Sequence, residues 1–275
     1  MRESVFAGSF YPGSKSEIEA FIKGEIAKAE VNAKAVAGAM AFVAPHAGYV
    51  YSGSTAAYTY KAMTLSKAAQ ADTIVVIGPN HTGLGMPIAV SMEDWKTPLG
   101  VMRNDAELSK AIVAESSGRA NEDETAHLEE HSIEVQLPFV QYALPGKKAC
   151  MICMGSQGEA SASALEEAIS SAAEKTGRKI AIVASSDFNH YEPVNTANWK
   201  DQLLFEALEG IDAKEFNRRL NANGCTVCGF GPITVAALFA KRNGAKKGVL
   251  LNYSNSGETA HDFTSVVTYA SIAFA

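Results

Sequence analysis

The chain has 275 residues, of which 47% are hydrophobic and 20% charged, and its formal net charge is −6. This is the composition of an ordinary globular protein with a sizeable core. The acidic balance argues against nucleic acid as the main partner, because a phosphate backbone is bound by a basic face. No apolar stretch approaches the roughly 18 residues of a membrane helix, and residues 1–17 lack the layout of a signal peptide. We therefore expect no membrane association and a cytoplasmic protein with reduced cysteines.

Apolar runs alternate with segments of helical periodicity along the chain. The runs are nearly uninterrupted Val, Ile and Ala, as in parallel strands that are buried on both faces. In chain order, the first expected elements are a helix over 17–30, a strand over 39–44, a helix over 54–63, strands over 73–77 and 86–91, and helices over 106–116 and 133–144. The remaining ones are a strand over 149–155, a helix over 161–175, a strand over 180–184, helices over 197–209, 212–222 and 232–244, and strands over 249–258 and 263–275.

Polar residues and glycines mark the ends of several of these helices. The expected amino-terminal caps are Ser16, Ser54, Asp105 and Ser132, and the expected stop is Gly177. Strands that alternate with helices predict an α/β fold, a three-layer αβα sandwich around a mainly parallel sheet. Because the chain has no internal repeat and no clear linker, we expect residues 1–275 to form a single domain.

Each of three histidines follows one of the apolar runs. His46 comes after the run 39–45, His81 after a second run and His190 after a third. In open α/β sheets, ligands bind beyond the carboxyl ends of the strands. Histidine binds metals and moves protons near neutral pH. One such histidine is more often hydrogen-bonded to backbone, but three at the same edge predict a shared active site.

Metal chemistry gives these residues different roles. Two histidines and an anionic ligand form the set that holds non-haem Fe(II) and leaves positions open for oxygen and substrate. A histidine outside that set can act as general acid or base. Asp187, three residues before His190, either orients an imidazole or joins the ligands. Its structural alternative is a helix cap or turn former.

The four cysteines form two pairs with the spacing of a structural zinc site. Cys150 and Cys153 lie in an apolar run, and residues three apart in a strand point to opposite faces. We therefore expect these two to be core residues. Cys225 and Cys228 flank a glycine-rich turn, and Cys228, which directly precedes Gly229, is the better candidate for a metal ligand.

The acidic segment 121–130 overlaps another histidine pattern. His127 and His131 match the His-x-x-Glu-His pattern of some zinc peptidases, which needs one helix to bring both histidines to one side. The segment is acidic and precedes the expected cap at Ser132, so a peptidase is the weakest hypothesis. A solvated loop is the simpler interpretation of the acidic run. His131 remains a candidate for the pocket.

Six ordered motifs give the chain a resemblance to a known family. They are PHAGYVYSG at 45–53, GPNHTG at 78–83, TPLG at 97–100, EHSIEVQLPF at 130–139, SSDFNHY at 185–191 and CTVCGFGPI at 225–233. Together with AGSFYPG at 7–13 they span nearly the whole chain, and they resemble the MEMO family. That family is similar in fold to class III extradiol ring-cleaving dioxygenases, which hold non-haem Fe(II) with two histidines and a carboxylate.

The resemblance implies a role for each candidate residue. His46 and His81 correspond to the family's metal histidines, Cys228 to its cysteine ligand, and His190 with Asp187 to the remaining site pair. The dioxygenases have a carboxylate where this family has a thiolate. A thiolate is a softer ligand, so it changes the preference of the site among iron, copper and zinc and argues against ring cleavage. The family is also implicated in binding phosphotyrosine peptides in animals.

Two functions follow as hypotheses. The first is a redox enzyme in which His46, His81 and Cys228 hold Fe(II), or copper or zinc instead, while His190 moves protons and is oriented by Asp187. The substrate pocket is expected to be lined by Tyr49, Tyr11 and His131. The second is a non-catalytic module that binds a peptide or a small molecule in the same pocket. The sequence is compatible with an oligomer.

Overall fold

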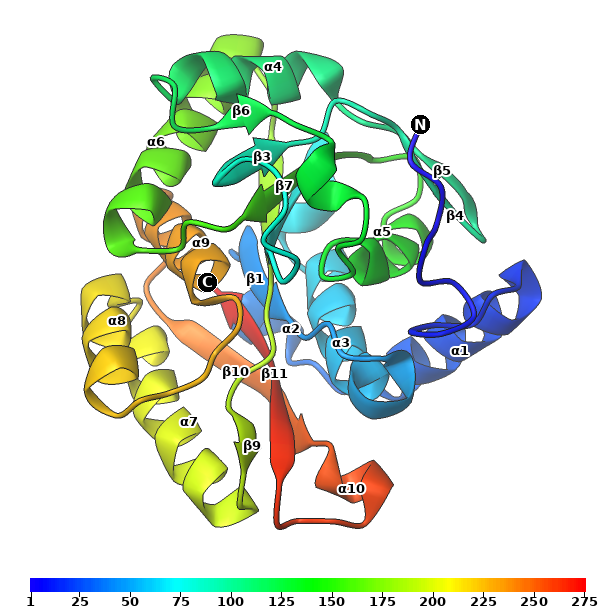
Figure 1. Cartoon of the computed structure of the whole chain (residues 1–275), viewed down its shortest axis with the longest axis vertical. Coiled ribbons are helices and arrows are strands. Elements are labelled where there is room, and N and C mark those ends of the chain that lie inside the picture. Colours follow the sequence, from blue (N-terminus) through cyan, green and yellow to red (C-terminus); the bar gives the residue numbers. More distant parts are fainter.

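The computed structural model describes residues 1–275 as alternating strands and helices (Figure 1). The strands are β1 (Ala41–Ala44), β2 (Thr73–Pro79), β3 (Ile88–Val90), β4 (Trp95–Thr97), β5 (Gly100–Met102), β6 (Asn121–Glu122), β7 (Lys148–Met154), β8 (Ile180–Ser185), β9 (His190–Glu192), β10 (Gly248–Asn255) and β11 (Val266–Phe274). The helices are α1 (Lys15–Lys28), α2 (Ala33–Val36), α3 (Tyr49–Thr64), α4 (Ala106–Glu115), α5 (Leu137–Ala143), α6 (Glu159–Thr176), α7 (Val194–Glu209), α8 (Ala213–Ala222), α9 (Phe230–Arg242) and α10 (Gly257–Ala260).

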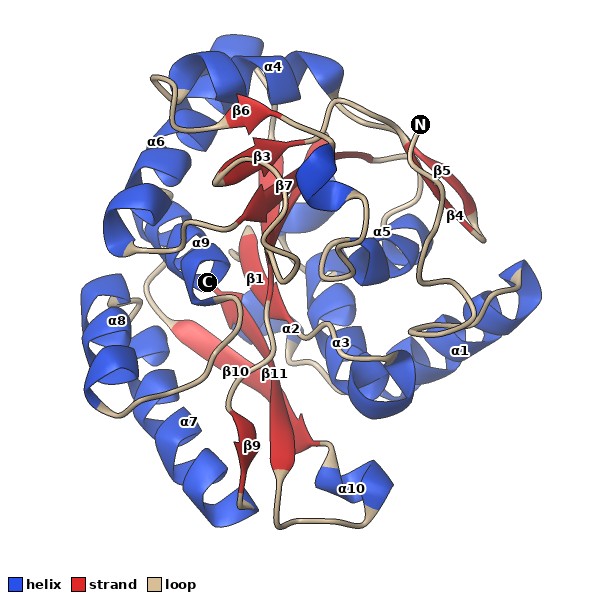
Figure 2. Cartoon of the chain, viewed as in Figure 1, coloured by secondary structure: helices blue, strands red, loops and turns tan.

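A nine-stranded sheet forms the middle layer, in the order β10-β11-β1-β8-β2-β7-β3-β6 with β9 paired to β11. Its centre is parallel, because β1, β8, β2 and β7 run in one direction. On the flanks, β11 is antiparallel to β1 and β10, and β3 is antiparallel to β7. Helices cover both faces (Figure 2). The predicted α/β sandwich around a mainly parallel sheet is therefore confirmed.

The central strands contribute to two separate cores, one on each face of the sheet. In β1, Ala41 and Val43 belong to the core beneath α6 and α9, whereas Phe42 belongs to the core beneath α1, α3 and α5. Burial on both faces explains why the strands are almost uninterrupted apolar runs. Cys150 and Cys153 of β7 lie in opposite cores, which confirms that they are core residues.

The helix ends agree only in part with the predicted caps. The Asp105 side chain accepts from the Leu108 amide and begins α4, and Gly177 ends α6 with a left-handed φ of 65°. Ser14, and not Ser16, is the cap of α1, because its side chain reaches the Glu17 amide.

Two further cap predictions are wrong. Ser54 lies inside α3, which begins after Gly48 without a side-chain cap. Ser132 caps no helix: a short 3-10 turn precedes α5, and the Ser132 hydroxyl donates to the Pro79 carbonyl at 3.0 Å. Pro138 lies in the first turn of α5, where a proline costs no helical hydrogen bond.

Some short strands were not predicted from the sequence. The hairpin of β4 and β5 and the strand β9 have three residues per strand and lie outside the runs predicted as strands, whereas β3, which is equally short, lies within a predicted strand. No helix of the chain combines the length and the apolar character that crossing a membrane requires.

Candidate metal centre

The carboxyl ends of the central parallel strands meet at one edge of the sheet, where the candidate site lies. His46 is two residues beyond β1, His81 two residues beyond β2 and Asp187 two residues beyond β8. His190 begins β9. His131 comes from a different segment, the loop between β6 and α5. The strand order thus brings together side chains that are far apart in the sequence.

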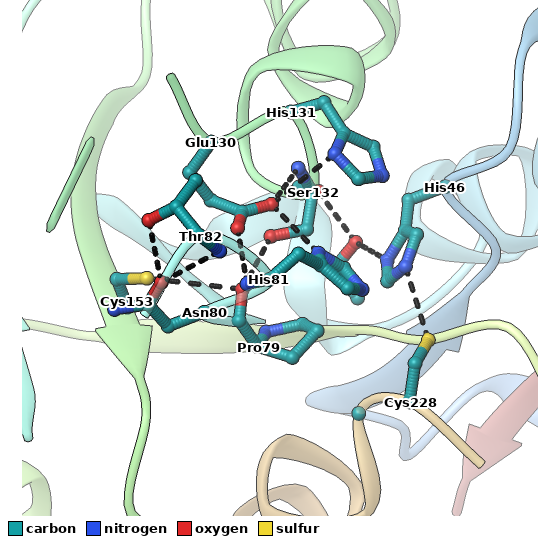
Figure 3. A network of polar contacts seen from close by, with 12 residues as sticks. His46, Pro79, Asn80, His81, Thr82, Glu130, His131, Ser132, Cys153 and Cys228 are labelled. Atoms are coloured by element: carbon teal, nitrogen blue, oxygen red, sulfur yellow. Dashed lines mark hydrogen bonds and ion pairs between the residues drawn. The ribbon is translucent and has the colours of Figure 1, made fainter. Parts of the chain in front are cut away.

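Three imidazoles converge on one point at this edge (Figure 3). One ligand nitrogen from each of His46, His81 and His131 lies within 4.8 Å of the others. The ring centroids are 5.1 Å apart for His46 and His81, and 4.7 Å apart for His81 and His131. Three histidine nitrogens are the ligand set of catalytic zinc sites, which keep a fourth position open. This group could therefore hold a metal ion.

The hydrogen bonds of His46 decide which of its nitrogens is free. Nδ1 lies 2.9 Å from Ser185 Oγ. That hydroxyl already donates to the Ser132 carbonyl at 2.6 Å and accepts from Gln136 Nε2 at 2.8 Å, so its remaining lone pair accepts from the imidazole. Nδ1 of His46 consequently carries the proton, and Nε2 keeps a lone pair for a metal.

Glu130 holds His81 in a similar way, but with a charged group. Its fully buried carboxylate accepts from His81 Nδ1 at 2.9 Å, from the His81 amide at 2.6 Å and from the Ser132 amide at 2.8 Å. Burial alone would raise the pKa of Glu130, but these hydrogen bonds, that of the His81 side chain first, lower it to about 2. The carboxylate is thus ionised at neutral pH, so His81 Nδ1 is the donor and Nε2 is free.

Burial keeps two of the imidazoles neutral. His46 is 2% exposed, and burial, followed by the neighbouring His131 and His81, lowers its pKa well below the usual value. Burial also lowers the pKa of His131 to about 4, and the rings of Phe6 and Phe10 pack against it at centroid distances of 5.7 and 4.7 Å. Neutral imidazole is the form that binds metals, so these two rings present lone pairs at pH 7.

Cys228 lies beside the three imidazoles. Its Sγ is 3.1 Å from His46 Nε2 and accepts from the Asp187 amide at 3.2 Å. Burial, and then the charge of Asp187, raises the pKa of this thiol, so a metal must displace its proton before the sulfur can bind. Gly229 makes the close approach possible, because a Cβ there would meet the Ser185 carbonyl oxygen at 2.4 Å.

Asp187 and His190 are held by different partners. The Asp187 carboxylate accepts from the His46 amide at 2.8 Å, and burial raises its pKa to about 6. His190 Nδ1 lies 2.7 Å from the Phe188 carbonyl and 2.9 Å from the Thr226 carbonyl. Carbonyls only accept, so Nδ1 carries a proton, and Nε2 is the nitrogen left for other partners. Two carbonyls, rather than the predicted Asp187, therefore orient the ring of His190.

A cavity of about 620 Å³ opens onto these groups. Its lining includes His46, His81, His131, Asp187, His190 and Cys228, together with the rings of Phe10, Tyr191 and Tyr269. A second cavity of about 640 Å³ lies near the amino-terminal ends of the same strands, beside Met40 and Ile180, and contains no group of potential metal ligands. The group of potential metal ligands thus lies at the carboxyl edge.

Two of the three expected pocket residues lie elsewhere. Tyr49 and Tyr11 are not part of the cavity lining, and both rings are buried in the core beneath α1, α3 and α5. The Tyr49 hydroxyl donates to the Val135 carbonyl and the Tyr11 hydroxyl to the Glu134 carboxylate, both at 2.7 Å. Their rings fill the core and their hydroxyls are satisfied there, so they support the wall behind the site. His131 does line the cavity.

In the segment 121–130 the peptidase pattern fails, and the solvated-loop interpretation holds only in part: Glu122 and Glu129 are exposed, whereas His127 and Glu130 are buried. His127 ends a 3-10 turn and is fully buried against Trp95, with neither ring nitrogen bonded, so it does not share a helix with His131. Glu130 is fully buried as well and is the partner of a candidate metal ligand. Sequence reasoning missed this role, and the only available signal was its position directly before a histidine.

The donor atoms suit a transition-metal ion. Neutral imidazole nitrogens with a thiol alongside favour iron, copper or zinc, whereas calcium and magnesium take oxygen ligands. The fixed Nδ1 protons of His46 and His81 leave both Nε2 atoms free, as metal binding requires. The residues present thus fit a bound transition metal.

An α/β domain with imidazoles and a cysteine gathered at the carboxyl edge of its sheet defines a class of candidate metal-binding proteins. The family model described as Memo-like protein matches residues 2–273, and the chain belongs to this family. It is 41% identical over 273 residues to a MEMO1 family protein of Methanosarcina barkeri, covering 99% of each chain. It is also 39% identical over 274 residues to a MEMO1 family protein of Archaeoglobus fulgidus, covering 100% of this chain and 99% of the relative. The predicted family is confirmed, while the likeness to extradiol dioxygenases stays a prediction.

Proposed function

We propose that this MEMO family protein is a metal-dependent redox enzyme with a mononuclear Fe(II) at the carboxyl edge of the sheet. Copper and zinc are the alternative ions. His46 and His81 hold the ion through Nε2, and either Cys228 or His131 completes a three-ligand set. When bound, the ion supplies open positions for oxygen or substrate and a change of oxidation state.

The observation that carries the proposal is the pair of hydrogen bonds at the Nδ1 atoms of His46 and His81. Ser185 Oγ and the Glu130 carboxylate each accept a hydrogen bond from Nδ1 of one imidazole, so Nε2 is the nitrogen that each ring presents to an ion. Pre-organised ligands of this kind are expected where a metal must bind tightly and in one geometry.

The other polar residues of the cavity supply proton transfer and positioning. His190 lines the cavity and its Nδ1 is bonded to backbone carbonyls, so its Nε2 is the nitrogen that would exchange a proton with a substrate hydroxyl. Asp187 holds the amide of His46 and so fixes the turn after β1. The rings of Phe10 and Tyr269 limit water in the cavity and pack against an apolar part of the substrate.

Anaerobic reconstitution with Fe(II) tests this proposal. Wild type is expected to bind one iron per chain, and His46→Ala and His81→Ala are expected to bind almost none. His261→Asn is the matched control, since His261 is exposed and its φ of 55° suits asparagine. Equal iron in His46→Ala and wild type would end the proposal. Oxygen uptake with a panel of phenols then tests turnover.

The third ligand is decided by two further variants. If the thiolate is a ligand, Cys228→Ser loses iron affinity and the wild type releases a proton on binding, because the thiol is protonated in the metal-free protein. If the imidazole is the ligand, His131→Ala has the larger effect and no thiol proton is released. Proton release is measured by titrating Fe(II) into weakly buffered protein with an indicator dye.

A second candidate function is recognition of a peptide or small molecule without turnover. The observation in its favour is Tyr191, which lines the cavity, is 77% exposed and has a strained φ of 58°. Such a module binds its ligand with an affinity that a chelator does not change. Binding that persists in His46→Ala, together with no oxygen uptake, would favour this function over the redox enzyme.

A further inference from the structure

Arg2 holds a segment that is more than 100 positions away in the sequence. It is only 6% exposed, and its Nε donates to the His127 carbonyl at 2.7 Å and its Nη2 to the Glu130 carbonyl at 3.1 Å. Its Nη1 donates to the Glu134 carboxylate. One side chain therefore fixes three points of the segment 127–134, from which the third imidazole of the site projects.

Glu134 connects this clamp to the backbone that follows Arg2. Its carboxylate also accepts from the amides of Val5 at 3.1 Å and Phe6 at 2.8 Å and from the Tyr11 hydroxyl at 2.7 Å. The side chain of Glu134 is fully buried and that of Arg2 is 5% exposed. Removing Arg2 would leave the buried Glu134 carboxylate without its cation, so the segment is expected to shift without the arginine.

Two of the three imidazoles depend on the segment that Arg2 holds. Glu130, whose backbone carbonyl accepts from Arg2, binds Nδ1 of His81 with its carboxylate. His131 is the next residue, so its ring follows the same backbone. The separation of these two rings is thus set by a side chain that hydrogen-bonds to neither of them.

We propose that Arg2 is a positioning residue of the metal centre: it keeps Glu130 against His81 and keeps His131 within the cluster. This inference rests on the proposed metal-binding function. It adds a residue that the ligand set by itself does not indicate. Loss of a group that orients metal ligands from behind typically weakens metal affinity by roughly 10–100-fold, and we expect an effect of that size for Arg2.

Titration of the full-length chain with Co(II) under nitrogen tests the proposal. Arg2→Ala is expected to raise the Kd roughly 10–100-fold and to change the visible Co(II) absorption, which reports the number and geometry of the ligands. Arg242→Ala is the matched control, because it removes an arginine–carboxylate pair, with Glu166, elsewhere in the fold. An unchanged Kd and spectrum in Arg2→Ala would overturn the inference.

A conservative variant separates positioning from loss of folding. Arg2→Lys keeps the buried charge but loses the planar fork that reaches three acceptors, so it is expected to fold and to bind Co(II) with intermediate affinity. A melting temperature close to that of wild type, together with an altered Co(II) spectrum, supports positioning. A wild-type spectrum and Kd in Arg2→Lys and in folded Arg2→Ala would contradict it.

A measurement without metal distinguishes failure of this inference from failure of the proposed function. In nitrogen-15 NMR of the metal-free protein, the His81 Nδ1 proton bonded to Glu130 is expected to be protected in wild type and in Arg242→Ala, and to exchange rapidly in Arg2→Lys. If wild type binds neither Fe(II) nor Co(II), the metal proposal fails, and this proton still decides the role of Arg2. Equal protection in all three proteins would show that the arginine does not position Glu130.

Discussion

A histidine binds a metal through the nitrogen that carries no proton, so the partner of its other nitrogen belongs to the site. For His46 this partner is the neutral Ser185 hydroxyl, and for His81 it is the ionised carboxylate of Glu130. A carboxylate raises the basicity of an imidazole more than a hydroxyl does. The two proposed ligands are therefore unequal, and His81 is expected to be the stronger donor.

His127 makes folding stability depend on pH. Burial, and then the nearby Arg2, lowers the pKa of His127 to about 4. In the unfolded chain its pKa is about 6.5. Between these values the unfolded state binds a proton that the folded state does not, so the free energy of unfolding falls as the pH falls from about 6.5 to about 4. Below that pH range, protonation of His127 has lowered the free energy of unfolding by roughly 3 kcal/mol.

Urea unfolding of chelator-treated protein at pH 7.5 and pH 5 measures this effect. His127→Leu is expected to lose clearly less stability than wild type between the two pH values. The buried His46 and His131 also have lowered pKa values and contribute with the same sign in both proteins, so only the difference between the proteins is assigned to His127. An equal loss in wild type and variant would refute the assignment.

At the scale of elements, local patterns found the central strands and missed what depends on distant contacts. The strand predicted over 73–77 is β2, and that over 180–184 is β8, because burial on both faces leaves an apolar run that the sequence displays directly. The start of α3 was misplaced because Ser54 looks like a cap, whereas the helix begins without a side-chain cap. The burial of Glu130 depends on Arg2 and His81, which no local pattern encodes.

The turn before α9 is held tightly against the end of β8. The Gly229 amide donates to Ser186 Oγ at 2.9 Å, and a Cβ on this glycine would lie 2.4 Å from the Ser185 carbonyl oxygen. The nearest atom belongs to the backbone of a buried strand, so it cannot move aside easily. Gly229→Ala is therefore expected to destabilise the fold by roughly 1–3 kcal/mol, the usual cost of overpacking.

Gly24→Ala in α1 is the control for that substitution. A Cβ at Gly24 meets no atom within 4 Å, and alanine favours the helix over glycine by about 1 kcal/mol, so this variant is expected to be as stable as wild type or more stable. Both variants are compared by the midpoint of urea unfolding. A midpoint for Gly229→Ala equal to that of wild type would show that the turn has more freedom than the contact distance implies.

For the molecule as a whole, the parallel sheet explains which part of the site the sequence could predict. His46 and His81 follow predicted strands, so their common edge could be inferred before the fold was known. His131 could be predicted only as a residue of the pocket lining. Its place among the potential metal ligands could not be inferred, because its loop is held by Arg2 and Glu134, a contact between residues 132 positions apart. Long-range packing of polar groups, and not strand order, decides which further side chain joins the two histidines.

The wide separation of these ligands in the sequence predicts that metal stabilises the entire fold. An unfolded chain does not hold His46, His81 and His131 together, so the ion binds the folded state, and at 100 times its Kd it adds about 2.7 kcal/mol. For a chain of this size, that raises the melting temperature by roughly 5–10 °C. Calorimetry with and without Co(II) should show this rise in wild type and in His261→Asn. An equal rise in His46→Ala would mean that the stabilising ion binds elsewhere.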